Sequence, residues 1–359
     1  MKVLAVVPSI YDTNPGQRYR IEQWEPYLKR EGIDIEYAPF EDEKLHQVLY
    51  QSGKATEKIR LIARAFGRRR KLLTRLKDLD AVYLFREAAL LGPPWIERRI
   101  AASGVPMVFD FDDAIFIPYR SPANGYLSYL KFPAKTAEIC RMARHVMAGN
   151  RYLAEYAGHT QSNVTIIPTT IDVARYVPGV PHAGDGIPVI GWTGSYSTVQ
   201  HLDRLRPVLQ KLRKSVPFRL RVICSTDYSL EDVEVDNVRW SSAREVTDLA
   251  GLDVGIMPLP NDRWSKGKCG CKALQYMGMG VPAVCSPVGV NTEIIQHGTN
   301  GFLADADDEW IDVLSQLLAS PELRRKMGGQ ARKTVETRYS AQQCAPRVAQ
   351  IFRDAAGNL

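Results

Sequence analysis

Short apolar runs alternate with helix-length segments along the whole chain, and this alternation limits the possible folds more than any other feature. In the first half, the runs that read as strands are residues 3–9, 33–39, 81–85, 106–111, 145–150 and 164–169. In the second half they are residues 188–194, 219–225, 252–259 and 281–286. Strands separated by helices form βαβ units, whose crossovers make neighbouring strands parallel. We therefore predict an α/β chain with a parallel sheet in each half.

The length and one interruption of the pattern predict two domains. A chain of 359 residues is long enough for two domains of ordinary size. Residues 176–188 are rich in proline and glycine, which is the composition of a linker. We expect a first domain over residues 1–178 and a second domain over residues 187–340.

The composition excludes several classes of protein. The chain is 45% hydrophobic and 24% charged, the balance of a globular protein rather than a disordered one. No window reaches the roughly 18 continuous apolar residues of a membrane-spanning helix, and the first residues read as a strand rather than a signal peptide. Six scattered cysteines indicate reduced thiols and a cytoplasmic protein. Cys269 and Cys271 lack a second pair of ligands, so they make a poor zinc site.

One segment carries most of the net charge. The formal charge is +7, and residues 58–77 hold nine basic residues and no acidic one. Ile59, Ile62 and Phe66 have helical spacing among them, so the segment reads as a cationic amphipathic helix. Such a helix suits an anionic membrane surface, or it packs on its own sheet through the same apolar stripe. No aromatic platform accompanies the charge, so we expect no nucleic-acid partner.

A glycine turn follows the first strand of the second half. Gly194, Ser195 and Ser197 stand between that strand and the next predicted helix. Glycine lets the backbone approach a ligand, and a helix that begins near Ser197 would offer N–H groups to a phosphate. An ordinary strand-to-helix turn with a serine cap explains the same residues. The turn alone leaves both interpretations open.

Lysines and glycines gather in residues 266–303. Lys266, Lys268 and Lys272 surround Gly270, just before a predicted helix over residues 270–278. Cations beside exposed amides at the start of a helix suit a diphosphate. Lysines on a solvated helix face are the alternative, and spacing alone favours it.

Three aspartates stand at the end of a predicted strand in the first half. Asp110, Asp112 and Asp113 close the apolar run that begins at residue 106, which places carboxylates at the edge of a sheet where ligands bind in α/β folds. The D-x-D spacing is similar to that of a metal site, or of a Mg-dependent phosphatase with Asp110 as nucleophile. A polar strand end with capping side chains is the third interpretation.

Three motifs stand in the second half and the segment before it. The first consists of Ile167, Pro168, Ile171, Asp172, Tyr176 and Pro178. The second consists of Gly270, Met277, Gly280, Pro282 and Val284, and the third of residues 289–303. Together they resemble the retaining GT-B glycosyltransferases of family 4, whose interdomain phrase the first motif matches; the second motif matches its family phrase loosely and the third closely. The resemblance covers residues 164–340, while the first half is similar mainly in layout. It implies a GT-B fold of two Rossmann-like parallel-sheet domains that face a central cleft, with a C-terminal helix in residues 341–359 that crosses back to the first domain.

The resemblance implies a transferase that moves a sugar from a nucleotide diphosphate sugar to a glycan or lipid-linked glycan, in cell-surface polysaccharide synthesis. It implies retention of the anomeric configuration, no metal and no other cofactor. The second domain would hold the donor, and the protein would work in the cytoplasm or on the inner face of the cell membrane. The donor-binding candidates are Gly194, Ser195, Ser197, Lys266, Gly270, Lys272, Gln275 and Glu293.

The same layout assigns the acceptor to the first domain. Asp112 falls near the histidine that family 4 enzymes carry beside the reacting sugar, so Asp112 or Asp113 would orient or deprotonate the acceptor hydroxyl. Lys268 would stabilise the charge on the departing diphosphate. A second rank of candidates for the acceptor or the diphosphate consists of Gly16, Arg18, Arg20 and Arg86.

The sequence departs from the family pattern at two places. The family's two glutamates fall at Gly267 and Gln275, and Gln275 can still hydrogen-bond ribose hydroxyls as a neutral group. The family's Arg and Lys after the first strand fall near Ser195 and His201. We infer that a lysine of the cluster at 266–272 supplies the missing charge. A nucleotide-sugar-binding relative without catalysis stays open, beside the phosphatase.

Overall fold

The computed structural model describes residues 1–49, 51, 53–118, 131–179, 186–196 and 198–357. The chain forms two compact units. Unit 1 consists of Met1–Thr169 and Cys344–Leu359, and unit 2 consists of Thr170–Gln343. Within the described ranges, no helix combines the length and the apolar character needed to cross a membrane.

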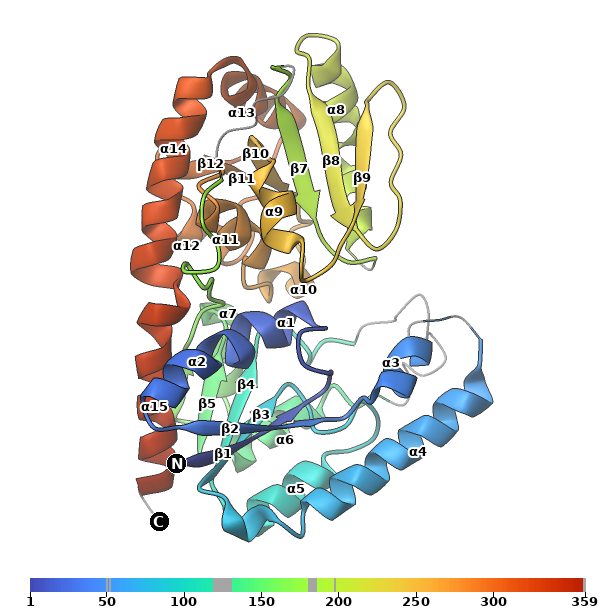
Figure 1. The fold of residues 1–359 in the computed structure, drawn as a ribbon, viewed down its shortest axis with the longest axis vertical. Helices are drawn as coiled ribbons and strands as arrows, with labels where there is room; N and C mark the ends of the chain where they lie inside the picture. The colour runs from blue at the N-terminus through green and yellow to red at the C-terminus, as the bar shows by residue number, and fades with distance from the viewer. Residues whose placement is uncertain (50, 52, 119–130, 180–185, 197, 358–359) are drawn as a thin grey trace. The chain divides into compact units, whose positions relative to one another are not determined.

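In the described part of unit 1, a six-stranded sheet has the order β2-β1-β3-β4-β5-β6 (Figure 1). Its strands are β1 (Lys2–Val7), β2 (Asp34–Pro39), β3 (Ala81–Phe85), β4 (Met107–Phe111), β5 (His145–Ala148) and β6 (Val164–Ile166). All pairs are parallel, and Val3 of β1 lies opposite both Ile35 and Ala81. Because β3 and β4 are buried at every position, they appear in the sequence as nearly unbroken apolar runs.

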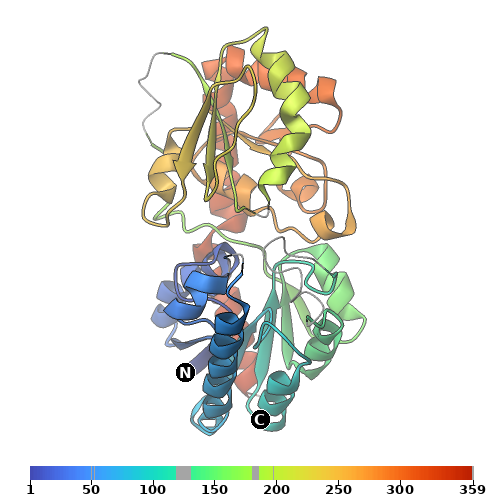
Figure 2. The same cartoon turned by 90° about the vertical axis from the view of Figure 1, so that its right-hand side faces the viewer.

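Helices cover both faces of this sheet (Figures 1 and 2). They are α1 (Pro15–Gln17), α2 (Gln23–Arg30), α3 (Glu43–Leu49), α4 (Ala55–Leu72), α5 (Trp95–Ala102), α6 (Lys135–Met142), α7 (Arg151–Gly158) and α15 (Ala341–Gly357). A π-helical turn, Arg18–Glu22, joins α1 to α2. Residues of α15 from Cys344 onward belong to unit 1.

Unit 2 repeats this architecture, and its described strands form a parallel sheet in the order β12-β11-β10-β7-β8-β9. They are β7 (Val189–Thr193), β8 (Arg219–Cys224), β9 (Val235–Arg239), β10 (Val254–Met257), β11 (Ala283–Cys285) and β12 (Gly301–Leu303). The helices are α8 (Arg206–Arg213), α9 (Glu245–Ala250), α10 (Arg263–Lys266), α11 (Cys271–Gly278), α12 (Asn291–Ile294), α13 (Asp307–Ala319) and α14 (Pro321–Thr334). The α/β class with two parallel sheets is therefore confirmed.

The first crossover of unit 2 changes helix type part-way. A 3₁₀ helix, Val199–Leu205, precedes α8, and Pro207 stands in the first turn of α8, where its missing N–H group costs no hydrogen bond. Leu202, Leu205, Leu209 and Leu212, spaced three or four residues apart, pack into the core of the unit. The predicted α-helix near Ser197 is thus a 3₁₀ helix from Val199, and the α-helix begins later.

The boundary between the units precedes the predicted linker. We expected the first domain to reach residue 178, whereas unit 2 begins at Thr170. Two contacts explain the difference: Ile171 pairs with Ser340 in a parallel bridge, and the hydroxyl of Tyr176 donates to Glu245 over 2.6 Å. Residues 180–185 of the predicted linker lie outside the described residues.

The strand order reverses once in each sheet. In unit 1 the sheet grows in opposite directions from β1 to β2 and β3, and in unit 2 from β7 to β8 and β10. At such a point the two connections leave on opposite faces of the sheet. The loops at the carboxyl ends of the two strands are therefore apart, and ligands of open α/β sheets bind in the space between these loops. The loops after β1, β3 and β4 in unit 1 and after β7 and β10 in unit 2 are therefore the places to examine.

Two adjacent glycines of α14 provide a stability test. A Cβ atom on Gly328 would overlap the carbonyl oxygen of Gly280, whereas one on Gly329 would meet nothing within 4 Å. We expect Gly328→Ala to lower the free energy of unfolding by about 2 kcal/mol or more, because the backbone contact must open. Gly329→Ala should raise it by about 0.5–1 kcal/mol through helix propensity. Denaturant unfolding of both variants checks this, and equal effects would contradict the packing described here.

Candidate functional site

The turn after β7 is closed by its own hydrogen bonds. The amide of Ser195 donates to Oγ1 of Thr198 over 3.1 Å, and the amide of Thr198 donates back to the carbonyl oxygen of Ser195 over 2.9 Å. A Cβ atom on Gly194 would overlap the ring of Trp192, so glycine is required there. Ser195 is exposed, and Ser197 lies outside the described residues.

Two of the predicted lysines lie at this end of unit 2. The ammonium nitrogen of Lys272 lies 5.5 Å from the ring centroid of Trp192 in β7, and that of Lys268 lies 5.2 Å from the ring centroid of Trp264. Both lysines are half-buried, whereas Lys266 is exposed. Lys268 and Lys272 are thus held over aromatic faces instead of extending into solvent.

His201 faces the same two lysines. Burial, followed by the charges of Lys272 and Lys268, lowers its pKa from 6.5 to about 4. Imidazole is therefore neutral at pH 7, and the lysines carry the positive charge of this cluster. The sequence places His201 where the resembled family has a cation, and in the structure Lys268 and Lys272 lie close enough to His201 to act on its charge.

A glycine begins the helix that follows the lysines. Gly270 precedes α11 with a φ of 69°, in the left-handed region that favours glycine, and a Cβ atom there would overlap Ile294. No side chain caps the helix at this residue. The first amides of the eight-residue α11 therefore lie beside Lys268 and Lys272 in sequence, the arrangement that we predicted for an anion.

The remaining donor candidates differ in their surroundings. Gln275 is 4% exposed, and its Nε2 donates to Oε1 of Glu245 over 3.2 Å. Sequence reasoning missed Glu245, because nothing in the spacing of the two residues indicates their contact. Glu293 is exposed on α12.

Asp110 and Arg20 form a closed ion pair in the interior of unit 1. Both are 0% exposed, Nε of Arg20 donates to Oδ2 of Asp110 over 2.9 Å, and Nη2 contacts Oδ1. The hydroxyl of Tyr83 also donates to Asp110. This arrangement corrects two of our expectations, because Arg20 has no access to a ligand and Asp110 cannot reach a phosphoryl group. The phosphatase interpretation therefore loses its nucleophile.

Asp112 and Asp113 share one cation at the carboxyl end of β4. Nε of Arg86 donates to Oδ1 of Asp112 over 2.7 Å, and Nη2 of Arg86 donates to Oδ2 of Asp113 over 3.0 Å. A Cβ atom on Gly16 would lie 2.7 Å from Nη2 of Arg86 and 2.8 Å from Oδ2 of Asp112. The structure therefore brings four predicted residues together, and only glycine fits in the loop above the ion pair.

A buried carboxylate that the sequence analysis missed supports the loop after β1. Oε1 of Glu22 accepts from Gln17 over 2.6 Å, and Oε2 accepts from the amide of Asp12 over 2.9 Å. Burial raises the pKa of Glu22 from 4.5 to about 7. Arg18 is 2% exposed and donates to Asp12 over 2.7 Å, so it also belongs to this loop framework.

The basic segment packs on its own unit. Leu61, Ile62 and Ala65 of α4 lie in the core with Phe40, and Phe66 packs against them. Arg69 is buried and donates to the carbonyl oxygens of three neighbouring segments. Arg60, Arg64 and Lys71 are exposed. The helix therefore turns Ile62 and Phe66 of the predicted stripe toward its own unit, whereas Ile59 is 61% exposed beside the exposed cations.

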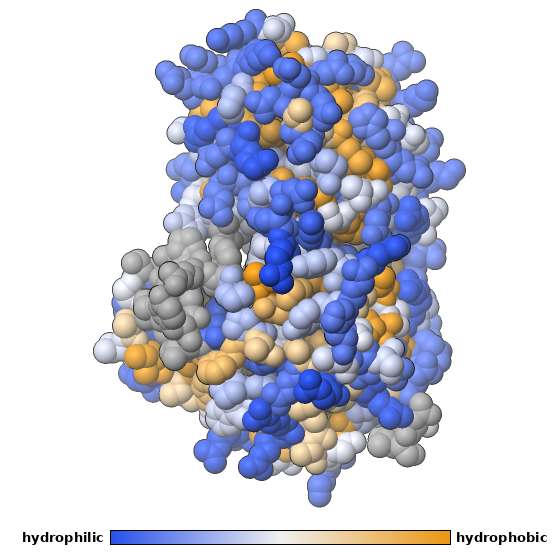
Figure 3. Space-filling model, turned by 180° about the vertical axis from the view of Figure 1, so that it is seen from behind, coloured by the Kyte–Doolittle hydropathy of each residue, from blue (hydrophilic) through white to orange (hydrophobic). Residues whose placement is uncertain are grey.

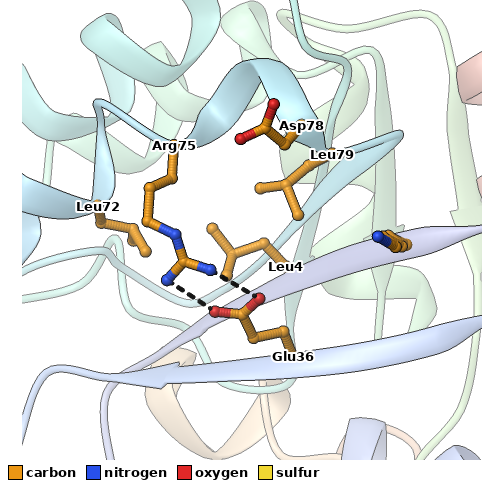
Figure 4. A pocket seen from close by; sticks show the side chains of 7 residues that line it. Leu4, Glu36, Leu72, Arg75, Asp78 and Leu79 are labelled. Atoms are coloured by element: carbon orange, nitrogen blue, oxygen red, sulfur yellow. Dashed lines mark hydrogen bonds and ion pairs between the residues drawn. The ribbon is translucent and has the colours of Figure 1, made fainter.

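The surface and a small hollow of unit 1 do not indicate a binding site. On the face seen in Figure 3, hydrophilic side chains predominate and apolar ones form small groups among them. A hollow of about 90 Å³ in unit 1 is lined by Lys2, Leu4, Glu36, Leu72, Arg75, Asp78 and Leu79, and the ion pair of Arg75 and Glu36 crosses it (Figure 4). It is too small for a nucleotide sugar.

Comparisons with known proteins identify the fold. Residues 187–320 match the family model described as glycosyl transferases group 1. The chain also aligns over its whole length with Anabaena HepE solved with UDP-glucose, at 14% identity and a TM-score of 0.69, covering 99% of this chain and 100% of that one. The chain has the GT-B fold. Sucrose-phosphate synthase from Thermosynechococcus elongatus is similar too, at 12% identity and a TM-score of 0.68, with both chains covered completely.

Similarity to curated relatives is partial. N-acetyl-alpha-D-glucosaminyl L-malate synthase of Bacillus anthracis is 34% identical over 91 residues, which is 25% of this chain and 24% of that protein. D-inositol 3-phosphate glycosyltransferase of Nocardia farcinica is 23% identical over 216 residues, 54% of this chain and 48% of that protein. The matches thus span a quarter to a half of these relatives.

Asp110 and Asp112 are expected to respond differently to the same change. Asp110→Asn leaves the buried Arg20 guanidinium without a counter-charge and should lower the free energy of unfolding by about 3–5 kcal/mol. Asp112→Asn leaves Arg86 with the charge of Asp113 and keeps a polar side chain at position 112, which is 9% exposed, so the loss should be smaller, about 1–2 kcal/mol. Denaturant unfolding compares the two. Similar losses of unfolding free energy would mean that Asp112, like Asp110, contributes mainly to the stability of the interior.

Glu22 predicts a pH dependence with a definite sign. Its pKa is about 7 in the folded protein and near 4.5 in the unfolded chain, so the folded protein binds more protons between these values. The free energy of unfolding should therefore fall as pH rises from 4.5 to 7, by at most about 1.4 kcal/mol per pH unit. Urea unfolding of wild type and Glu22→Gln at several pH values measures the difference. Parallel pH profiles would exclude this role of Glu22.

Proposed function

We propose that this chain transfers a sugar from a nucleotide diphosphate sugar to a glycan or lipid-linked glycan acceptor. The observation that carries the proposal is the cation cluster of unit 2, where Lys268 and Lys272 face His201 at the carboxyl end of β7. Two ammonium groups beside the glycine-started helix α11 suit a diphosphate. The match of residues 187–320 to group 1 glycosyltransferases covers the same elements.

The names of similar proteins support this donor class. HepE was solved with UDP and with UDP-glucose, and both curated relatives carry the names of enzymes that transfer or join sugars. In our proposal unit 2 binds the nucleotide diphosphate through Gly194, Ser195, Ser197, Lys266, Gly270, Lys272, Gln275 and Glu293. The resemblance to family 4 supports retention of the anomeric configuration.

Lys268 is proposed to act on the leaving group. Departure of the nucleotide diphosphate concentrates negative charge on its terminal phosphate, and a fixed ammonium group stabilises that charge more in the transition state than in the ground state. Lysines and helix amides would supply the positive charge, so the transfer that we propose requires no metal ion. The half-buried position of Lys268 reduces the competition from water.

Unit 1 is proposed to hold the acceptor. Asp112 and Asp113 would orient the acceptor hydroxyl, and Arg86 fixes both carboxylates in place. Gly16 allows close approach to this pair, and Arg18 shapes the neighbouring loop. We place the protein in the cytoplasm, in cell-surface polysaccharide synthesis, with the exposed cations of α4 against the anionic inner face of the membrane.

Calorimetric titration with UDP, GDP, ADP and CDP, each with and without EDTA, tests the proposal. We expect one nucleotide to bind at micromolar strength with an affinity that EDTA leaves unchanged. Transfer of the matching sugar to an acceptor then separates an enzyme from a relative that only binds. Absence of binding by all four nucleotides, or binding that EDTA abolishes, would overturn the proposed donor site.

Loss of the charge of Lys272 should weaken nucleotide binding more than loss of the charge of an exposed lysine of the same unit. Lys272→Met removes a charge from the proposed diphosphate site and should weaken nucleotide binding about tenfold or more. Lys326→Met, on the exposed part of α14, should leave the affinity within about twofold. His201→Gln should also change it little at pH 7.5, because the imidazole is neutral there. Equal affinities for the Lys272 variant and wild type would remove this lysine from the site.

A further inference from the structure

Glu245 is a buried carboxylate within reach of three donors from different parts of unit 2. Glu245 begins α9 and is 2% exposed. Its Oε1 accepts from Nε1 of Trp240 over 3.0 Å and from Nε2 of Gln275 over 3.2 Å, and its Oε2 accepts from the hydroxyl of Tyr176 over 2.6 Å. The carboxylate is therefore fixed from three directions.

Arg332 holds one of these donors in place. Its guanidinium, from α14, donates to the carbonyl oxygen of Val173 over 2.9 Å and also contacts the carbonyl oxygens of Tyr176 and Gly278. Gly278 ends α11, the helix that carries Gln275. Arg332 thus holds both the segment that carries Tyr176 and the helix that carries Gln275. Because Tyr176 in turn donates to Glu245, these contacts keep Glu245 next to Gln275.

The orientation of the Gln275 amide follows from the chemistry of this contact. A carboxylate only accepts hydrogen bonds, so the NH₂ group of Gln275 must face Glu245. Its Oε1 then points to the other side, where it accepts a hydrogen bond from Sγ of Cys271, 3.9 Å away in the first turn of α11. Donation from the NH₂ group to a carboxylate polarises the amide and makes its oxygen a stronger acceptor.

We propose that Glu245 is a positioning residue for the donor nucleoside, because it fixes the orientation in which Oε1 of Gln275 accepts hydrogen bonds, from the thiol of Cys271 and, in the complex, from a ribose hydroxyl. This inference rests on the proposed function, which places a nucleoside diphosphate in unit 2. It also explains the neutral side chain at position 275. A glutamate there would place two carboxylates about as close as the 3.2 Å contact, inside the protein, where like charges repel strongly.

A charge exchange between the two positions tests the pairing. Gln275→Glu should lower the melting temperature by several degrees and weaken UDP binding, or binding of whichever of the four diphosphates wild type takes, about tenfold or more. The double variant Glu245→Gln/Gln275→Glu again pairs one carboxylate with one amide, and it should regain binding to within about threefold of wild type. A double variant that binds as weakly as Gln275→Glu would overturn the proposal.

Loss of single ribose hydroxyls separates positioning from stability. Wild type should bind the diphosphate at least about fivefold more tightly than its 2′-deoxy or its 3′-deoxy form, because one hydroxyl donates to Gln275. Glu245→Gln should reduce this preference toward unity, since an amide at 245 no longer fixes the Gln275 amide. Asn300→Ala removes a buried network elsewhere in the unit and should lower the melting temperature while it keeps the preference.

The outcomes distinguish this inference from the proposed function. If wild type binds none of the four nucleotides, the proposed function fails and the inference fails with it. If wild type binds a nucleotide and Glu245→Gln retains the full preference for ribose, the inference alone is wrong. If Glu245→Gln lowers the melting temperature as Asn300→Ala does and changes nothing else, Glu245 serves stability only.

Discussion

Because the strands of each sheet are parallel, the candidate functional side chains gather at one edge of each sheet. Every pairing described in the two sheets is parallel, so all strands of a sheet end at the same edge. Residues that follow different strands are thereby gathered without being near one another in sequence. Arg86 follows β3 and Asp112 follows β4, and they meet because those strands are neighbours. The same rule brings Lys272 to the end of β7 from a position eighty residues after Trp192.

The sequence predicts most of the elements that are buried on both sides. Strand β3 is found over the predicted residues 81–85. Its unbroken apolar run between helix-length segments is typical of a strand that is buried on both faces of a parallel sheet. Strands β9 and β12 were missed. β9 is polar and half-exposed, and β12 has three residues, so neither differs in sequence from a loop. Edge strands depend on pairing with a neighbour more than on their own composition.

The sequence predicts groups of site residues that are neighbours along the chain, but it does not predict contacts between side chains that are far apart in sequence. The grouping of Lys268 and Lys272 near Gly270 is local and was predicted. The pairing of Arg20 with Asp110 joins residues ninety positions apart. The three aspartates that the sequence groups together therefore divide into Asp110, in a closed interior pair, and Asp112 and Asp113, which share Arg86 at the edge of the sheet. Net charge misleads in the same way, because Arg69 counts toward the basic segment yet lies inside unit 1. The role of each charged residue depends on its burial, and burial cannot be read from the spacing of residues in the sequence.

The distribution of the thiols gives this protein a built-in reporter. Five of the six cysteines are buried, and Cys271 is half-exposed. Cys271 opens α11, next to Lys272 and one helical turn from Gln275. A maleimide dye should therefore label this position ahead of the others and attach beside the proposed donor site. Fluorescence of such a conjugate would follow occupancy in real time without any engineered cysteine.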